Sequence, residues 1–274
     1  MSHGGNAAAH TTSRFDVRSA DGTSIAVWVD GEGPPLVLVH GSLIDHTIFE
    51  PLVDELADTV TTFSMDRRGF GASGDAARYS IEREFEDVAA VVDAVAAHTV
   101  GPVALWGHSY GAGCAMGGAA LTSNVHHLVL YEPSLGLAYP PGSIERIEEA
   151  VAAGDMEAAI LAVLVDTLEM TEEDVASLRS SPQWPVLLVA GPTVPRECRA
   201  EIGWSYRAGQ FDGIAAPTLL LAGSESPAAL NDATHQAAAA ISGARIEVLE
   251  GHGHLAIETD PAMVAATIRE FISS

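Results

Sequence analysis

Short apolar runs alternate with longer amphipathic stretches along most of the chain's 274 residues. Two of these runs, Pro35–Val39 and residues 102–106, contain no charged side chain and suit strands buried on both faces. Residues 81–98 repeat apolar side chains at helical spacing, with Ser80 as the expected N-cap. Because buried strands that alternate with helices form parallel sheets, the pattern predicts an α/β fold with a mostly parallel central sheet flanked by helices.

The remaining elements of the core follow from the same pattern. An opening β-hairpin is expected around Val17 and residues 24–29, turned at Asp21-Gly22. Further strands are predicted at residues 60–63, 127–131, 217–222 and 245–249, and a closing helix at residues 261–271.

The alternation stops between residues 132 and 217. Short helices are expected at residues 143–153, 156–168 and 171–178, whereas residues 184–206 are less regular. The block is too long for a single crossover and too helical for a loop. We therefore expect a helical lid, residues 136–212, inserted before the last two strands of a core formed by residues 13–135 and 213–274. Residues 1–12 are predicted to be a disordered leader.

The composition constrains the partners. Acidic residues outnumber basic ones by 37 to 13, every basic residue is arginine, and the formal net charge is −24. Such a surface repels nucleic acid and anionic membranes, so a small-molecule substrate is expected, with no nucleic acid and no membrane partner. The chain has no signal-peptide pattern and no apolar run of about 18 residues, which predicts a cytoplasmic protein. The sequence leaves open whether the protein forms a homodimer.

One motif indicates chemistry. Gly107-His108-Ser109-Tyr110-Gly111 matches G-x-S-x-G directly after a buried strand and directly before a helix. In that setting a tight turn holds the serine hydroxyl above the carboxyl ends of the strands, where ligands bind in open α/β sheets. The alternative is a glycine-rich turn without chemistry, but the strand–turn–helix context favours Ser109 as a nucleophile.

From this motif on, the chain resembles the α/β-hydrolase superfamily. His40-Gly41-Ser42 is similar to the family's oxyanion loop, and residues 66–73 are similar to its D-x-R-G-x-G-x-S turn. Gly253-His254, ahead of Pro261, resembles its terminal histidine motif. The resemblance covers nearly the whole chain and implies a serine hydrolase with the chain order Ser, acid, His, working without cofactor or metal.

The resemblance implies His254 as the base, since it fits the family's spacing to the final helix and His252 does not. The acid departs from the pattern, because the usual aspartate position is Ser226, and a serine cannot supply the charge that stabilises an imidazolium. The alternatives are Glu132, Glu225 and Asp232. Glu132 is favoured, because dehalogenases and the lactonases that open zearalenone take their acid from the same strand end.

The oxyanion hole and the pocket complete the predicted site. The resemblance assigns the oxyanion hole to the backbone amides of Ser42 and Tyr110. Apolar and aromatic side chains from the loop and the lid are expected to bind an uncharged, hydrophobic substrate. The expected pocket residues are Leu43, Ile44, Trp184, Trp204 and Tyr206.

The predicted function is hydrolysis of a carboxylic ester or a lactone through an acyl-enzyme, by Ser109, His254 and Glu132. One alternative is hydrolysis of a carbon–carbon bond in a diketone-type substrate, for which Arg196 or Arg199 would need to face the pocket. A cofactor-free haloperoxidase or perhydrolase is also compatible. A catalytically silent ligand-binding protein is the alternative from another class, and it predicts no reaction with a fluorophosphonate probe.

Overall fold

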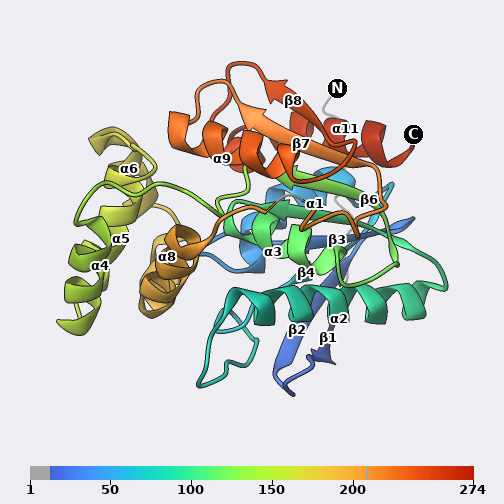
Figure 1. The fold of residues 1–274 in the computed structure, drawn as a ribbon, viewed down its shortest axis with the longest axis horizontal. Helices are drawn as coiled ribbons and strands as arrows, with labels where there is room; N and C mark the ends of the chain where they lie inside the picture. Colours follow the sequence, from blue (N-terminus) through green and yellow to red (C-terminus); the bar gives the residue numbers. More distant parts are fainter. Residues whose placement is uncertain (1–12, 208) are drawn as a thin grey trace, which may run out of the picture.

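The protein is described by a computed structural model over residues 13–207 and 209–274, so the predicted leader at residues 1–12 lies outside the described residues. The strands are Ser13–Arg18 (β1), Ser24–Asp30 (β2), Pro35–Val39 (β3), Thr61–Met65 (β4), Val103–His108 (β5), Val125–Tyr131 (β6), Thr218–Gly223 (β7) and Arg245–Leu249 (β8). Within the described ranges they form one eight-stranded sheet in the order β1-β2-β4-β3-β5-β6-β7-β8 (Figure 1).

The sheet is mostly parallel, as predicted. β1 and β2 form the opening hairpin, with Gly22 at φ 87° in its turn, and β2 also runs antiparallel to β4. From β4 to β8 every neighbouring pair is parallel, so the carboxyl ends of β3, β5, β6, β7 and β8 meet at one edge of the sheet.

Helices cover both faces of this sheet. The helices of the core are Glu50–Leu56 (α1), Ile81–Thr99 (α2), Tyr110–Ala119 (α3), Ala228–Ala239 (α9), Ala256–Thr259 (α10) and Pro261–Ile272 (α11), with a 3-10 turn at His46–Phe49. Ser80 is the N-cap residue of α2, as predicted, but its side chain makes no capping hydrogen bond to the first turn.

The alternation of side chains in β3 shows how the two layers of core arise. Leu36 and Leu38 point to the face that packs against α1 and α11. Val37 and Val39 point to the opposite face, which packs against α2 and α3. Because both faces of the strand are buried, an uninterrupted apolar run was the correct signal for it.

Between β6 and β7 the chain forms a helical insert. Its helices are Ser143–Ala152 (α4), Met156–Asp166 (α5), Glu172–Arg179 (α6), Trp184–Ala190 (α7) and Val194–Gly203 (α8). Helices α4, α5, α6 and α8 gather at one end of the molecule (Figure 1). The expectation that residues 184–206 are irregular was wrong for α7 and α8. Their prolines, Pro185 and Pro195, lie in the first turn, where proline starts a helix rather than breaking it.

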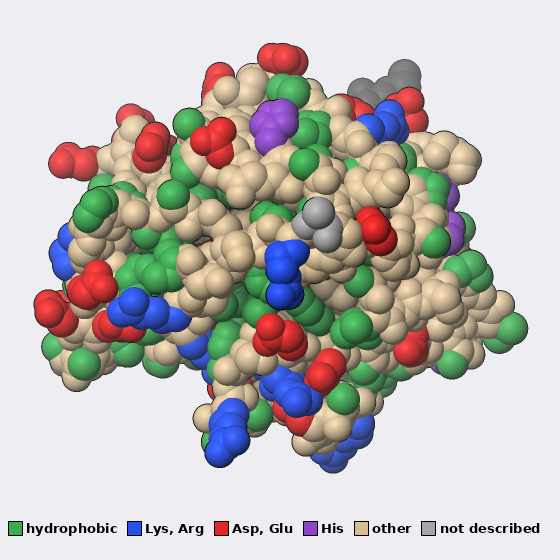
Figure 2. All heavy atoms as spheres, viewed as in Figure 1, with side chains coloured by type: hydrophobic (Ala, Val, Ile, Leu, Met, Phe, Trp, Pro, Cys, Tyr) green, Lys and Arg blue, Asp and Glu red, His purple; other side chains and the backbone are tan. Residues whose placement is uncertain are grey.

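Acidic side chains are scattered over the face seen in Figure 2, with apolar and arginine side chains between them. This distribution agrees with the formal net charge of −24. Among the described residues, no helix combines the length and the apolar character needed to cross a bilayer.

A buried guanidinium joins the insert to the core. Arg67, fully buried after β4, donates to Glu84 of α2 at 2.9 Å and to Glu197 of α8. Its other terminal nitrogen donates to the carbonyl of Gly41 at 2.9 Å, in the loop after β3. The two carboxylates outweigh burial and hold the pKa of Arg67 above its ordinary value. One side chain therefore connects α2, α8 and the loop beside the nucleophile.

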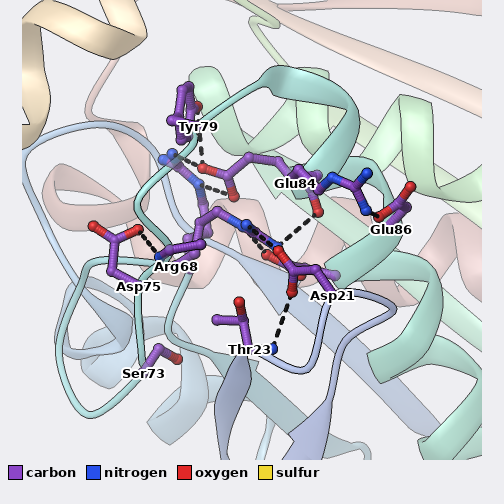
Figure 3. Close-up of polar contacts among 12 residues, drawn as sticks. Asp21, Thr23, Arg68, Ser73, Asp75, Tyr79, Glu84 and Glu86 are labelled. Carbon is purple, nitrogen blue, oxygen red and sulfur yellow. Dashed lines mark hydrogen bonds and ion pairs between the residues drawn. The ribbon is translucent and has the colours of Figure 1, made fainter.

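Arg68 forms a second buried network beside it. Its guanidinium binds both carboxylate oxygens of Asp87, at 2.6 and 2.7 Å, and Asp21 at 3.0 Å. Figure 3 shows Asp21 approaching from the hairpin and Glu84 from α2. Asp75, which is also labelled in Figure 3, accepts a hydrogen bond from Arg196 of α8 at 2.7 Å, which adds a second contact between the insert and the core.

Replacing Arg67 by leucine is expected to lower the free energy of unfolding by about 3–5 kcal/mol, because Glu84 and Glu197 would remain buried without their cation. The matched control is Arg14→Leu, since Arg14 pairs with Asp16 at the exposed surface and its loss should cost less than about 1 kcal/mol. Urea denaturation followed by circular dichroism measures both. Equal effects of the two substitutions would contradict this account of Arg67.

Candidate active site

Ser109 lies in the turn between β5 and α3. Its backbone has φ 57° and ψ −124°, a conformation that costs energy for a residue other than glycine and that concentrates at functional sites. The amide of Ser109 donates to the carbonyl of Tyr131 at 2.8 Å. The amide of Ser134 donates to the carbonyl of Ser109 at 3.4 Å. The end of β6 therefore holds the strained turn in place.

The two glycines of the motif are required by close approach. A Cβ on Gly107 would lie 2.6 Å from the carbonyl oxygen of Gly111. A Cβ on Gly111 would lie 2.2 Å from the carbonyl oxygen of His40. Both distances are far below van der Waals contact, so side chains are excluded on either side of Ser109.

His254 and Glu132 meet at the same edge of the sheet. His254 follows β8, and Glu132 is the first residue after β6. The Nδ1 atom of His254 lies 2.5 Å from Oε2 of Glu132, and both side chains are buried. The other carboxylate oxygen of Glu132 accepts the amide of Gly223, at the end of β7, at 2.7 Å. Glu132 itself has φ 45°, a second strained backbone among these residues.

The environment of Glu132 keeps it ionised. Burial alone would raise its pKa, but the hydrogen bond and charge of His254 outweigh burial, helped by the Ser226 hydroxyl and the Gly223 amide, and the pKa is lowered. An ionised Glu132 accepts a hydrogen bond from the protonated Nδ1 of His254. The unprotonated Nε2 is then the basic nitrogen of the ring. This is the tautomer that a general base next to Ser109 needs.

The other predicted acids lie elsewhere. Glu225 and Asp232 are both exposed, and the described contacts of Glu225 are made by its backbone. His252 is half-buried and lies 3.9 Å from Asp260. Ser109 and His254 thus line one cavity, and His254 contacts Glu132 rather than the alternative acids.

Two aromatic side chains fix the loop that carries His254. The Nε2 atom of His108 lies 2.8 Å from the carbonyl of His254, and burial, with the nearby His254, lowers the pKa of His108, so the neutral ring donates from Nε2. The hydroxyl of Tyr131 donates to the carbonyl of Gly253. Neither contact could be predicted from the sequence, because a tyrosine at the end of a buried strand is not distinguishable from a packing residue and the partner of His108 is 146 residues away in the chain.

The loop after β3 lies against the nucleophile. A Cβ on Gly41 would lie 3.0 Å from the Cβ of Ser109, so Ser42 and Tyr110 flank the serine from the loop and from the first turn of α3. His40 accepts the amide of Arg67 at 2.9 Å and donates from Nδ1 to the carbonyl of Gly41 at 2.8 Å. Burial and the charge of Arg67 lower the pKa of His40 to about 3, so it is neutral and structural.

A cavity opens over Ser109 and His254, between the core and the insert. Leu43 and Ile44 line it, as predicted. The insert supplies mainly aliphatic walls, from Val163, Leu164, Leu168, Met170, Leu178 and Leu187. This composition suits an apolar substrate group.

The three predicted aromatic residues of the insert do not belong to this lining. Trp204 packs edge-on against Phe85 of α2 and next to Tyr206, in the core on the far side of the sheet. Trp184 packs against a hydrophobic cluster that contains side chains of both the insert and the core, with Arg179 over its ring. The insert therefore uses these large aromatic side chains for packing.

A buried carboxyl group in the cavity wall was missed by the sequence analysis. Glu201 of α8 is 3% exposed and accepts hydrogen bonds from the hydroxyls of Ser134 and Tyr139. Burial outweighs these hydrogen bonds and raises its pKa to about 7. A glutamate on an amphipathic helix is ordinarily solvent-exposed, so the sequence carried no signal for this position.

The described residues contain one group that could hold a metal ion, Asp45, His46 and Asp66, outside the cavity. The oxygens of Asp66 already accept from His46, Trp28 and the amide of Ala72. We therefore assign this group to holding the turn after β4.

The chain is similar to known hydrolases over nearly its whole length. The pattern of the alpha/beta hydrolase family matches residues 36–267. A pimeloyl-[acyl-carrier protein] methyl ester esterase of Stenotrophomonas maltophilia is 30% identical over 264 residues, covering 89% of this chain and 95% of the relative.

Solved structures with the same fold include other alpha/beta hydrolases. An alpha/beta hydrolase from Sphaerobacter thermophilus superimposes with a TM-score of 0.81 at 32% identity, covering 94% of this chain and all of the other. An enol-lactonase from Burkholderia xenovorans gives a TM-score of 0.75 at 22% identity, covering 95% and 100% of the two chains. The protein is thus a hydrolase, and the chain belongs to the alpha/beta hydrolase family.

Proposed function

We propose that the protein is a serine hydrolase that cleaves a carboxylic ester or a lactone through an acyl-enzyme. The observation that carries the proposal is the buried 2.5 Å contact between His254 and Glu132, with His254 lining the same cavity as Ser109. A serine, an imidazole and an oriented carboxylate are the groups that acyl transfer requires.

The first half-reaction forms the acyl-enzyme. The hydroxyl oxygen of Ser109 bonds to the carbonyl carbon of the substrate while Nε2 of His254 takes the hydroxyl proton. Glu132 stabilises the resulting imidazolium through Nδ1. The negative charge on the substrate oxygen is met by the amides of Ser42 and Tyr110. The carbon–oxygen bond to the alcohol then breaks, and His254 returns the proton to the leaving oxygen.

The second half-reaction releases the acid. Water gives a proton to His254 and bonds to the acyl carbon, and the bond to Ser109 breaks as the serine oxygen regains a proton. Opening a lactone follows the same steps, with the alcohol still attached to the product.

Hydrolysis of a carbon–carbon bond is less well supported. That reaction was expected to need Arg196 or Arg199 in the pocket. Arg196 instead bonds Asp75 and the carbonyl of Arg68, and Arg199 bonds Glu148 at the surface. Neither belongs to the cavity lining.

The proposed nucleophile is tested with an active-site probe. A fluorophosphonate should label the wild-type protein at Ser109, as mapped by mass spectrometry of the peptides. Ser109→Ala should lose both the label and about 10⁴-fold in the rate of p-nitrophenyl acetate hydrolysis. A protein that folds normally but takes no label would favour the silent ligand-binding alternative.

The proposed acid is tested by two matched substitutions. Glu132→Gln should lower kcat with p-nitrophenyl acetate at neutral pH by about 10³-fold, because the amide cannot stabilise the imidazolium and favours the wrong tautomer. Glu225→Gln is the control, since that side chain is exposed, and its rate should stay within about twofold. The reverse order of effects would move the acid to the loop after β7.

A further inference from the structure

The cavity over Ser109 contains a polar cluster that the proposed reaction does not use. Glu201 is buried in the cavity wall, and the hydroxyls of Ser134 and Tyr139 donate to opposite oxygens of its carboxylate. Ser134 and Tyr139 follow β6, whereas Glu201 comes from α8 of the insert. The cluster therefore faces the space between the core and the insert.

The cluster lies close to the reacting serine. The amide of Ser134 donates to the carbonyl of Ser109 at 3.4 Å, and Ser134 follows Glu132 by two residues. Ser134, Tyr139 and Glu201 line the same cavity as Ser109 and His254. A substrate chain attached at Ser109 would therefore run past the Glu201 carboxyl group.

Glu201 has no cation of its own among the described residues. The nearest guanidinium, Arg67, pairs with Glu84 and with Glu197, one helical turn before Glu201. Cys198 and Tyr139 are its other titratable neighbours, and Glu258 and His254 lie in the same cavity wall. A buried carboxylate without an ion pair is costly, so its charge makes the cavity unfavourable for another anion.

We propose that Glu201, Ser134 and Tyr139 form a subsite that binds a hydroxyl group of an uncharged ester or lactone and rejects substrates that carry a carboxylate. The inference rests on the proposed function and specifies its substrate class. Because the protons of both hydroxyls are donated to Glu201, the hydroxyl and carboxylate oxygens keep free lone pairs, which can accept a hydrogen bond from a substrate hydroxyl. A substrate carboxylate meets the negative charge of Glu201 in a largely apolar cavity, where repulsion is poorly screened.

The charge of Glu201 makes the rejection depend on pH. Because burial raises the pKa of Glu201 to about 7, the group passes from mostly neutral at about pH 6 to mostly charged at about pH 8. A neutral Glu201 tolerates an anionic substrate, whereas a charged Glu201 repels it. Discrimination against the anion should therefore increase as the pH rises.

Three methyl esters of equal chain length provide the test: methyl hexanoate, methyl 6-hydroxyhexanoate and monomethyl adipate. We expect kcat/KM to be highest for the hydroxy ester and lowest for the adipate. The kcat/KM for methyl hexanoate divided by the kcat/KM for monomethyl adipate should rise about tenfold from pH 6 to pH 8, because the fraction of neutral Glu201 falls by about that factor. The pH dependence of the chemical steps that both esters share cancels in this ratio, because both esters use the same catalytic groups.

Variants assign the effect to the cluster. In Glu201→Gln the ratio should not change with pH. Tyr139→Phe removes one donor to the carboxylate and should move the midpoint of the change to higher pH. Glu258→Gln is the matched control, a second carboxyl group of the same wall, and it should keep the pH dependence. A ratio independent of pH in the wild type, or unchanged by Glu201→Gln, overturns the subsite.

Binding separates this proposal from the proposed function. The same esters are titrated into Ser109→Ala by calorimetry at pH 6 and pH 8, without turnover. Selective binding of the hydroxy ester, with weaker adipate binding at pH 8, supports the subsite even if the wild type cleaves no ester. Turnover of methyl hexanoate with no discrimination in either measurement leaves the hydrolase standing and rejects the subsite.

Discussion

The buried guanidinium of Arg67 connects three separate parts of the molecule. It binds Glu84 from α2, Glu197 from the insert, and the carbonyl of Gly41 in the loop beside Ser109. Removing a charge from water is costly, so such a group is stable only where all of its partners are in place. The position of α8 and the shape of the loop next to the nucleophile are therefore set by the same interaction.

The parallel sheet explains why residues so distant in sequence meet at one point. The carboxyl ends of β5, β6, β7 and β8 deliver Ser109, Glu132, Gly223 and His254 to one edge. Two of these residues, Ser109 and Glu132, have backbones in the left-handed region. Strain of this kind persists only when the surroundings hold it, and here neighbouring strand ends supply the hydrogen bonds that do so.

Much of the core could be predicted because its signals are local. Pro35–Val39 is a strand with the predicted bounds, and the glycines around Ser109 follow from sterics within a single turn. The insert was harder, because an aromatic side chain on an amphipathic helix packs equally well toward a cavity or toward the body. Trp204 and Tyr206 pack against the body. The burial of Glu201 in the cavity wall could not be predicted, because it results from the packing of α8 against the core and not from the local sequence.

The loop after β7 lies beside Glu132 and does not supply a carboxylate of its own at position 226. At the position where relatives carry an aspartate, Ser226 and the Gly223 amide now favour a negative charge on Glu132. In the family pattern this loop supplies the carboxylate that accepts a hydrogen bond from the histidine, whereas here its Gly223 amide donates a hydrogen bond to Glu132. An aspartate at position 226 would therefore place a second carboxylate beside Glu132, and the repulsion between the two charges would favour the protonated form of one of them.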